Sequence, residues 1–236
     1  MTSETNLIVE PAGPGDVEAL AALLVQLFAA ELPGALRGAE GSRRALLRYI
    51  LEAEGGAALL GRYVARDAAG AAVGSVALRP PGAPPPDFAP RGVVARGLAL
   101  FGPLATARMA GTLARTLLTP APPLPPDAAH LHGLVVDAGQ RGRGLGAALV
   151  GKAEGLAAAL GRRAVHLQVV VGNHAARRLY ARLGYRVVGR SPRWLDPLTF
   201  PAECMAKALE ARDRAGGCYP QPPCRAPKTT RRAGPS

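Results

Sequence analysis

The stretch Arg141-Gly142-Arg143-Gly144-Leu145-Gly146 lies between a short apolar run that begins at His130 and a helix-like pattern that continues to Leu160. Glycine has no Cβ atom and adopts positive φ readily, so consecutive backbone N–H groups in such a turn can face one anion. The helix that follows adds its unpaired first-turn N–H groups and the positive end of its dipole, and the arginines add charge. The stretch therefore predicts a strand, a phosphate-binding turn and a helix.

Two well-known phosphate-binding motifs fit this turn poorly. A Walker A loop requires Lys followed by Ser or Thr after its last glycine, and here Ala147 and Ala148 follow. A Rossmann turn has the spacing Gly-x-Gly-x-x-Gly, whereas this turn has Gly-x-Gly-x-Gly. The glycines alone also allow a tight turn that binds no ligand.

Residues 173–185 form the second informative segment and read Asn-His-Ala-Ala-Arg-Arg-Leu-Tyr-Ala-Arg-Leu-Gly-Tyr. Asn173 can cap a helix, and Gly184 can end it with a positive φ. Leu179 and Leu183 lie one turn apart and can pack inward. At every defined position the segment resembles the Asn-x-x-Ala-x-x-Leu-Tyr-x-x-x-Gly-Phe/Tyr pattern of the GNAT acetyltransferase superfamily. The glycine turn likewise resembles that family's Arg/Gln-x-x-Gly-x-Gly/Ala signature.

The order of the expected elements agrees with this resemblance. A first strand at residues 7–9 precedes two amphipathic helices, a strand hairpin within 59–79 and, after an insertion, the strand–helix–strand unit of 130–171. Such a unit implies a parallel or splayed strand pair with a right-handed crossover. The resemblance implies an α/β architecture with the GNAT (acyl-CoA N-acyltransferase) fold: a mixed central sheet with splayed parallel strands flanked by helices, plus a helical insertion.

We expect one N-acetyltransferase (GNAT) domain over residues 5–209, with a proline-flanked helical insertion at 80–128 and a disordered, basic, proline-rich tail at 210–236. The insertion has an apolar, helix-like centre that is interrupted at Gly102-Pro103. It could pack back on the domain or on a second subunit, cover the acceptor site as a lid, or lie on a membrane as an in-plane anchor. The first role is favoured.

The resemblance implies acetyl-CoA as cosubstrate, with its pyrophosphate in the glycine turn and its pantetheine arm along the preceding strand. The backbone of that strand would bind the arm and polarise the thioester carbonyl. We expect no metal ion. The residues expected to bind the cofactor are Leu134, Val135, Val136, Arg141, Gly142, Arg143, Gly144, Leu145, Gly146, Ala147, Asn173 and Tyr180.

Tyr180 carries the chemical prediction. Periodicity alone would make it an aromatic core residue, but in the family the tyrosine at this position hydrogen-bonds the cofactor sulfur and can protonate the departing thiolate. A phenol with an ordinary pKa of ~10 is protonated at neutral pH, as this role requires. A base must also accept a proton from the acceptor ammonium. His130 and His132, on one face of the strand, are the candidates, and His174 is a weaker one.

The amino-acid composition limits which ligands and which cellular environment we expect for this protein. The 236 residues carry a formal net charge of +12, but the arginines are dispersed and aromatic residues make up only 4%, which argues against nucleic acid as the main ligand. The three cysteines have neither metal-ligand spacing nor an even count for disulfides. The first residues lack a signal-peptide pattern. We expect a soluble, cytoplasmic protein.

These observations predict an N-acetyltransferase that moves an acetyl group from acetyl-CoA to a primary amine of a small molecule or protein by direct attack. The acceptor itself has no signature in the sequence. Two alternatives use the same observations: a non-catalytic acyl-CoA-binding or regulatory module, and an interaction protein that contacts membrane or nucleic acid through the insertion and the arginines. A homodimer is compatible with an apolar insertion helix.

Overall fold

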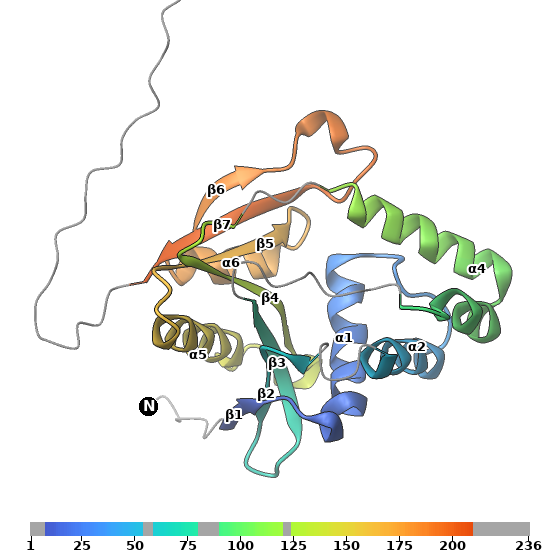
Figure 1. Ribbon diagram of the computed structural model, residues 1–236, viewed down its shortest axis with the longest axis horizontal. Coiled ribbons are helices and arrows are strands. Elements are labelled where there is room, and N and C mark those ends of the chain that lie inside the picture. The colour runs from blue at the N-terminus through green and yellow to red at the C-terminus, as the bar shows by residue number, and fades with distance from the viewer. Residues whose placement is uncertain (1–7, 54–58, 80–89, 120–123, 210–236) are drawn as a thin grey trace, which may run out of the picture.

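The computed structural model describes residues 8–53, 59–79, 90–119 and 124–209 (Figure 1). They form one seven-stranded sheet with helices on both faces. The predicted tail, together with the parts of the insertion at 80–89 and 120–123, lies outside the described residues.

The elements follow the predicted order. The strands are β1 Ile8–Pro11, β2 Arg62–Arg66, β3 Ala72–Arg79, β4 Ala128–Val136, β5 Ala164–Val170, β6 Arg186–Arg190 and β7 Ala202–Ala208. The helices are α1 Val17–Glu31, α2 Glu40–Ala53, α4 Val93–Leu117, α5 Leu145–Ala159 and α6 His174–Arg182, with short 3-10 helices η1 Pro14–Asp16, η2 Ala138–Gln140 and η3 Arg193–Leu195.

The sheet has the strand order β1-β2-β3-β4-β5-β7-β6. β1 to β4 form an antiparallel meander, β4 and β5 are parallel, and β7 pairs antiparallel with both β5 and β6. The parallel pairing runs from Ala128 and Ala164 to Leu131 and Leu167 and then stops. Beyond that point β4 continues beside β3 and β5 continues beside β7, so the two strands splay. The predicted mixed sheet with a splayed parallel pair is confirmed.

A bulge at Gly133 lies where β4 leaves β5. The register of β4 on β3 shifts at this point, and Gly133 has φ +61, which a glycine adopts without strain. A Cβ atom there would lie 3.3 Å from Nη1 of Arg62. The glycine therefore both turns the strand and leaves room for a buried guanidinium.

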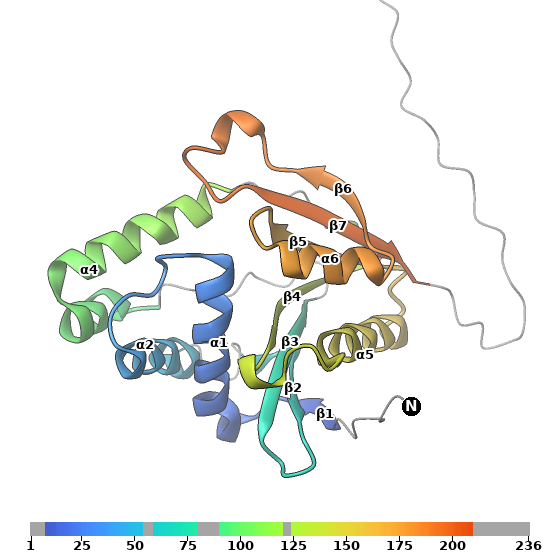
Figure 2. The ribbon, with the colours of Figure 1, turned by 180° about the vertical axis from the view of Figure 1, so that it is seen from behind.

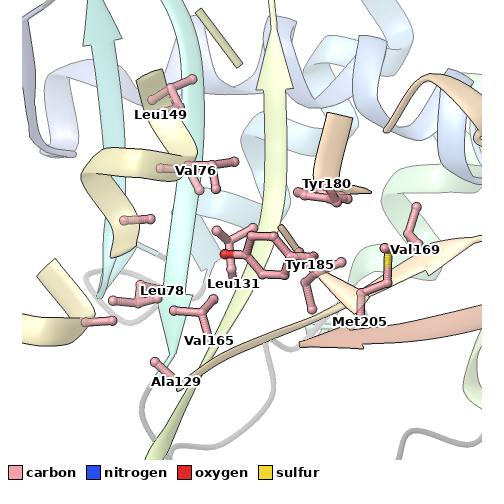
Figure 3. Packing of buried hydrophobic residues seen from close by; sticks show 14 of the residues in the cluster. Val76, Leu78, Ala129, Leu131, Leu149, Val165, Val169, Tyr180, Tyr185 and Met205 are labelled. Carbon is pink, nitrogen blue, oxygen red and sulfur yellow. The ribbon is translucent and has the colours of Figure 1, made fainter. Parts of the chain in front are cut away.

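Two apolar clusters hold the helices on opposite faces of the sheet. Neighbouring residues of β2 point to opposite faces: Val64 joins the cluster under α1 and α2, and Ala65 joins the cluster under α5 and α6. In the second cluster Leu149 and Tyr180 pack near strand residues such as Leu131 (Figure 3). Figure 2 shows both helical layers from behind. Each fully buried leucine stabilises the fold by ~1.5–3 kcal/mol.

Helix α4 is the centre of the insertion and connects two distant parts of the domain. As predicted, it is kinked at Gly102, which has φ +75 and precedes Pro103. Near its start, the Tyr49 hydroxyl of α2 donates to the Arg91 carbonyl over 2.8 Å. Near its end, the Arg115 guanidinium lies 4.8 Å from the centre of the Phe200 ring, between β6 and β7. Figure 1 shows α4 reaching from α2 toward that segment.

None of the helices in the described part of the chain combines the length and apolar character needed to cross a bilayer.

Candidate functional site

The glycine turn joins β4 and η2 to α5 and has the geometry of an anion cradle. Gly142 and Gly144 have φ +80 and +81, and a Cβ atom at either would meet nothing within 4 Å. Gly144 is the N-cap of α5. Within the described chain, the backbone N–H groups from Arg143 to Ala147 find no protein acceptor. An open face with several free donors at a helix N-terminus fits a pyrophosphate.

Gly146, the third glycine, has a packing role. A Cβ atom there would lie 3.1 Å from Cδ2 of Leu179 on α6 and 3.9 Å from Cγ2 of Val136 on β4. It therefore allows α5 to begin close against α6 while its N–H remains on the cradle. Both motifs of the sequence meet at this contact.

A glutamine from α1 holds the turn in place. Gln26 Nε2 donates to Asp137 Oδ1 over 2.9 Å, and its Oε1 accepts from the backbone N–H of Ala138 over 2.8 Å. Arg141 donates from Nε to the Val136 carbonyl over 3.1 Å and from Nη2 to the same glutamine oxygen over 3.3 Å. The hydrogen bond from Gln26 is the main reason that the pKa of Asp137 is lowered. Arg141 thus supports the turn as well as adding charge to it.

We expect Gln26→Leu to lower the free energy of unfolding by about 1–3 kcal/mol, because Asp137 Oδ1 and the Ala138 N–H lose the hydrogen bonds that Gln26 makes to them. The pKa of Asp137 is lower in the folded protein than its ordinary value of 3.8. The hydrogen bond from Gln26 to the Asp137 carboxylate therefore stabilises the fold fully above pH 3.8, and this stabilisation disappears as pH falls through the folded-state pKa. Denaturant unfolding of both proteins at pH 7 and at pH 3 measures the difference. If the wild type and the variant differed in unfolding free energy by the same amount at both pH values, the stabilising role of the Gln26–Asp137 hydrogen bond would be contradicted.

The splay of the sheet exposes the backbone of β4 beside the turn. Leu134, Val135 and Val136 follow the last residue that pairs with β5, so their edge toward β5 has no strand beside it in the described sheet. Asn173 lies just beyond the C-terminal end of β5, at the start of α6, where its Oδ1 accepts from the Ala176 N–H over 3.2 Å. The expected helix cap is confirmed.

Tyr180 lies in the last turn of α6 and has 6% of its surface exposed. Its ring meets Tyr185 edge to face, with 5.6 Å between the ring centres, at the border of the apolar cluster (Figure 3). Burial raises the pKa of the Tyr180 phenol, and the charge of Glu31 raises it further. The phenol is therefore a proton donor at neutral pH. Arg177, one turn earlier, fixes α6 to β7 through bonds of 2.8 and 2.9 Å to Glu203.

His130 and His132 lie side by side on β4, with stacked rings whose centres are 5.7 Å apart. Burial is the main cause that lowers the pKa of His130 to about 4 and that of His132 to about 3, and the nearby arginines 79 and 62 add to it. Both imidazoles are therefore neutral at pH 7. Because their protonated forms are strongly disfavoured, each is a weak proton acceptor. His174 is exposed at the first position of α6.

Glu31 is a site residue that the sequence analysis missed. It ends α1, is half-buried, and lies near enough to Tyr180 for the carboxylate charge to affect the phenol. Burial raises the pKa of its carboxyl to about 7. One signal could have identified it: an acidic residue at the C-terminal end of a helix faces the negative end of the helix dipole, which is unfavourable without a reason.

Two cavities meet at Glu31. The larger one, ≈ 350 Å³, lies between α1, α2 and α4 and includes His132 and Gly133 of β4. The smaller one, ≈ 160 Å³, is lined by Gln168 and Val170 of β5 together with residues of α4 and of the segment before β7. Glu31 lines both, so its carboxyl stands between the splayed strands and the insertion. In the described part of the chain, no three His, Cys, Asp or Glu residues gather as a metal site.

Comparison with known proteins agrees with this geometry. The family model described as "Acetyltransferase (GNAT) family" matches residues 37–185, which is more than half of the chain. A curated relative, an uncharacterized N-acetyltransferase from Methanocaldococcus jannaschii, is 46% identical over 59 residues. That match covers 25% of this chain and 26% of the relative, so the chain spans about a quarter of that protein's length.

Solved structures show the same fold over most of the chain. The structure described as histone acetyltransferase HPA2 and related acetyltransferase from Corynebacterium glutamicum aligns with a TM-score of 0.55 and 26% identity, covering 85% of this chain and 95% of that one. A GCN5-related N-acetyltransferase from Kribbella flavida aligns with a TM-score of 0.50 and 21% identity over 86% and 98% of the two chains. At 21% identity, the similarity to the Kribbella flavida structure shows a shared fold and nothing more.

Proposed function

Because the chain belongs to the acetyltransferase (GNAT) family, we propose that it transfers the acetyl group of acetyl-CoA to a primary amine. One observation carries the proposal: the cradle of free N–H groups from Arg143 to Ala147 continues into the unpaired edge of β4. A pyrophosphate in the cradle and a pantetheine arm on residues 134–136 would place the thioester at the splay. Tyr180 and Glu31, which are close enough for the Glu31 charge to act on the phenol, would then face the reacting atoms.

The reaction needs a proton acceptor before the amine can attack. An alkylammonium with a pKa near ~10.4 is neutral in only about one molecule in 10³ at pH 7. We assign the acceptor role to the Glu31 carboxylate, since its pKa of about 7 lies closest to the working pH among the candidates. His130 and His132 stay predictions as bases, and their lowered pKa values argue against them.

The remaining steps follow from the same arrangement. The amine nitrogen attacks the thioester carbonyl carbon, which the backbone N–H groups of β4 polarise, and a C–N bond forms as the C–S bond breaks. The Tyr180 phenol donates its proton to the departing sulfur. The nitrogen loses a second proton to solvent as the amide forms, and the Tyr180 phenolate regains a proton from solvent. The products are the amide, the thiol and one released proton.

Tyr180→Phe tests the acid. We expect kcat to fall at least about tenfold, because the thiolate then leaves without its proton donor, while the affinity for acetyl-CoA stays nearly unchanged. Tyr185→Phe is the matched control, since it removes a hydroxyl from a neighbouring buried ring. Thiol release followed by absorbance measures kcat. An unaltered kcat in Tyr180→Phe would remove the phenol from the mechanism.

The proposal as a whole is tested by calorimetric titration of the purified chain with acetyl-CoA, followed by acetylation assays with a panel of amines. Saturable binding with turnover supports the transferase. Saturable binding without turnover of any amine would instead favour the non-catalytic acyl-CoA-binding alternative, and the absence of binding to the folded protein would overturn the proposal.

A further inference from the structure

The larger cavity is built as much by the insertion as by the rest of the domain. α1 and α2 supply one wall, and both limbs of α4 supply the opposite one. The limbs meet closely, because a Cβ atom on Gly97 would lie 3.1 Å from Cγ2 of Thr106. The lining residues are mostly aliphatic: Leu24, Leu27, Leu46, Leu47, Ile50 and Leu51 from α1 and α2, and Val93, Val94, Met109, Ala110 and Leu113 from α4.

The polar side chains of this cavity are few: Glu31 at the end of α1, Arg62 of β2, His132 of β4, and Thr106 and Thr116 of α4. Glu31 is the one carboxylate among the described lining residues. Its position at the junction with the smaller cavity puts a negative charge at one end of a mostly aliphatic space, whereas the Arg62 guanidinium lies beside Gly133 on the β4 side. A volume of ≈ 350 Å³ lies within the range of ~300–1,000 Å³ that is typical of small-molecule sites.

The single carboxylate among mostly aliphatic walls favours some classes of amine over others. A polyamine carries several ammonium groups and would need several carboxylates, because an unpaired ammonium among aliphatic side chains is strongly disfavoured. A small polar amine would leave the apolar walls unfilled. An amine with one ammonium group and a bulky hydrocarbon body satisfies both ends of the site, because burial of apolar area is favourable and the charge meets Glu31.

We propose that the cavity between α1, α2 and α4 is the acceptor site and that it takes an arylalkyl or branched-alkyl primary amine, with the hydrocarbon body against α4 and the ammonium at Glu31. The inference rests on the proposed function and names its acceptor class. The insertion then has a definite role, since it forms the wall that selects the body of the acceptor.

The test compares amines of different class in one assay. With acetyl-CoA, we expect 2-phenylethylamine to be acetylated with a kcat/KM at least about tenfold above those of spermidine and ethanolamine. Equal or higher values for either polar amine, or no product from 2-phenylethylamine, would overturn the acceptor class. Replacing acetyl-CoA by octanoyl-CoA tests the competing use of the cavity as an acyl-chain pocket. A higher kcat/KM with octanoyl-CoA than with acetyl-CoA would show that the cavity binds the acyl chain of the donor, and it would contradict the proposal.

A pair of variants on one limb of α4 tests the location. Both Ala110 and Ala107 are exposed on the second limb of α4, but Ala110 lines the cavity and Ala107 does not. Ala110→Trp should raise KM for 2-phenylethylamine at least about tenfold, and Ala107→Trp should change it less than about twofold. Equal KM values in the two variants would place the acceptor elsewhere.

Direct binding separates the two proposals. Calorimetry with 2-phenylethylamine and, independently, with acetyl-CoA is run on the wild type and both variants. If acetyl-CoA does not bind but 2-phenylethylamine binds and Ala110→Trp removes that binding, the transferase proposal fails and the amine site stands. If acetyl-CoA binds to all three proteins and 2-phenylethylamine binds to none, the amine site fails and the cofactor site stands.

Discussion

Gly144→Glu is expected to weaken acetyl-CoA binding by at least about a hundredfold, which corresponds to about 3 kcal/mol. Gly144 has φ +81, a conformation that glutamate adopts only with strain, and the new side chain would begin at the open face of the cradle. Its carboxylate would also repel the pyrophosphate. Loss of two charge-assisted hydrogen bonds, at about 1.5–3 kcal/mol each, is sufficient for the effect.

Two companion variants separate the causes. Gly155→Glu adds the same charge to α5 at a position where a Cβ atom meets nothing within 4 Å, far from the turn, and should leave the dissociation constant within about twofold. Gly144→Ala retains the strain without the charge and should give an intermediate loss. Calorimetric titration of all three with acetyl-CoA measures the constants. A wild-type dissociation constant in folded Gly144→Glu would refute the cradle as the pyrophosphate site.

Glu31→Gln is expected to lower kcat at least about a hundredfold, since general-base catalysis typically contributes ~10²- to 10⁴-fold. The carboxyl has a pKa of about 7 and works as a base only when ionised. The wild-type kcat/KM should therefore rise as pH increases through about 7, and this rise should be absent in the variant. Rates of thiol release between pH 5.5 and 9 measure the profile. A rise that persists in Glu31→Gln and vanishes in His132→Gln would assign the base to the histidine.

The same substitution should stabilise the protein. The folded pKa of Glu31, about 7, is above the ordinary value of 4.5, so the folded state holds this proton more tightly than the unfolded state. Stability therefore falls as pH rises from 4.5 to about 7, and the cost of the buried charge is fully present above that range. We expect Glu31→Gln to gain about 1–3 kcal/mol at pH 8 and little at pH 4. A purely structural glutamate would not combine a gain in stability with a loss of activity.

The parts of the site that depend on local sequence could be predicted. The turn at Gly144, the cap at Asn173 and the end of α6 at Gly184 follow from the backbone conformations that glycine and asparagine favour, and such preferences act within a few residues. The mixed sheet followed from the order of strands and helices. In these places local preference and the final fold agree.

The parts that depend on distant segments could not be predicted. The support of the turn by Gln26 joins residues more than a hundred positions apart, and nothing in the periodicity of α1 marks it. The weak basicity of His132 comes from burial and from Arg62, neither of which is visible along one strand. Glu31 acquires its raised pKa from the packing around the end of α1, and the cavity beside it exists only because α4 lies across α2.

The attachment of α4 has a consequence for how this enzyme could change over evolutionary time. Within the described chain, neither apolar cluster that stabilises the sheet contains a residue of α4. Its lining side chains can therefore be exchanged with little loss of folding free energy, whereas changes in the cradle or in α6 would disturb the core and the chemistry together. If α4 forms the acceptor wall as proposed, selection for a new acceptor could act on α4 alone, and acetyl transfer would be retained while the range of acceptors changed.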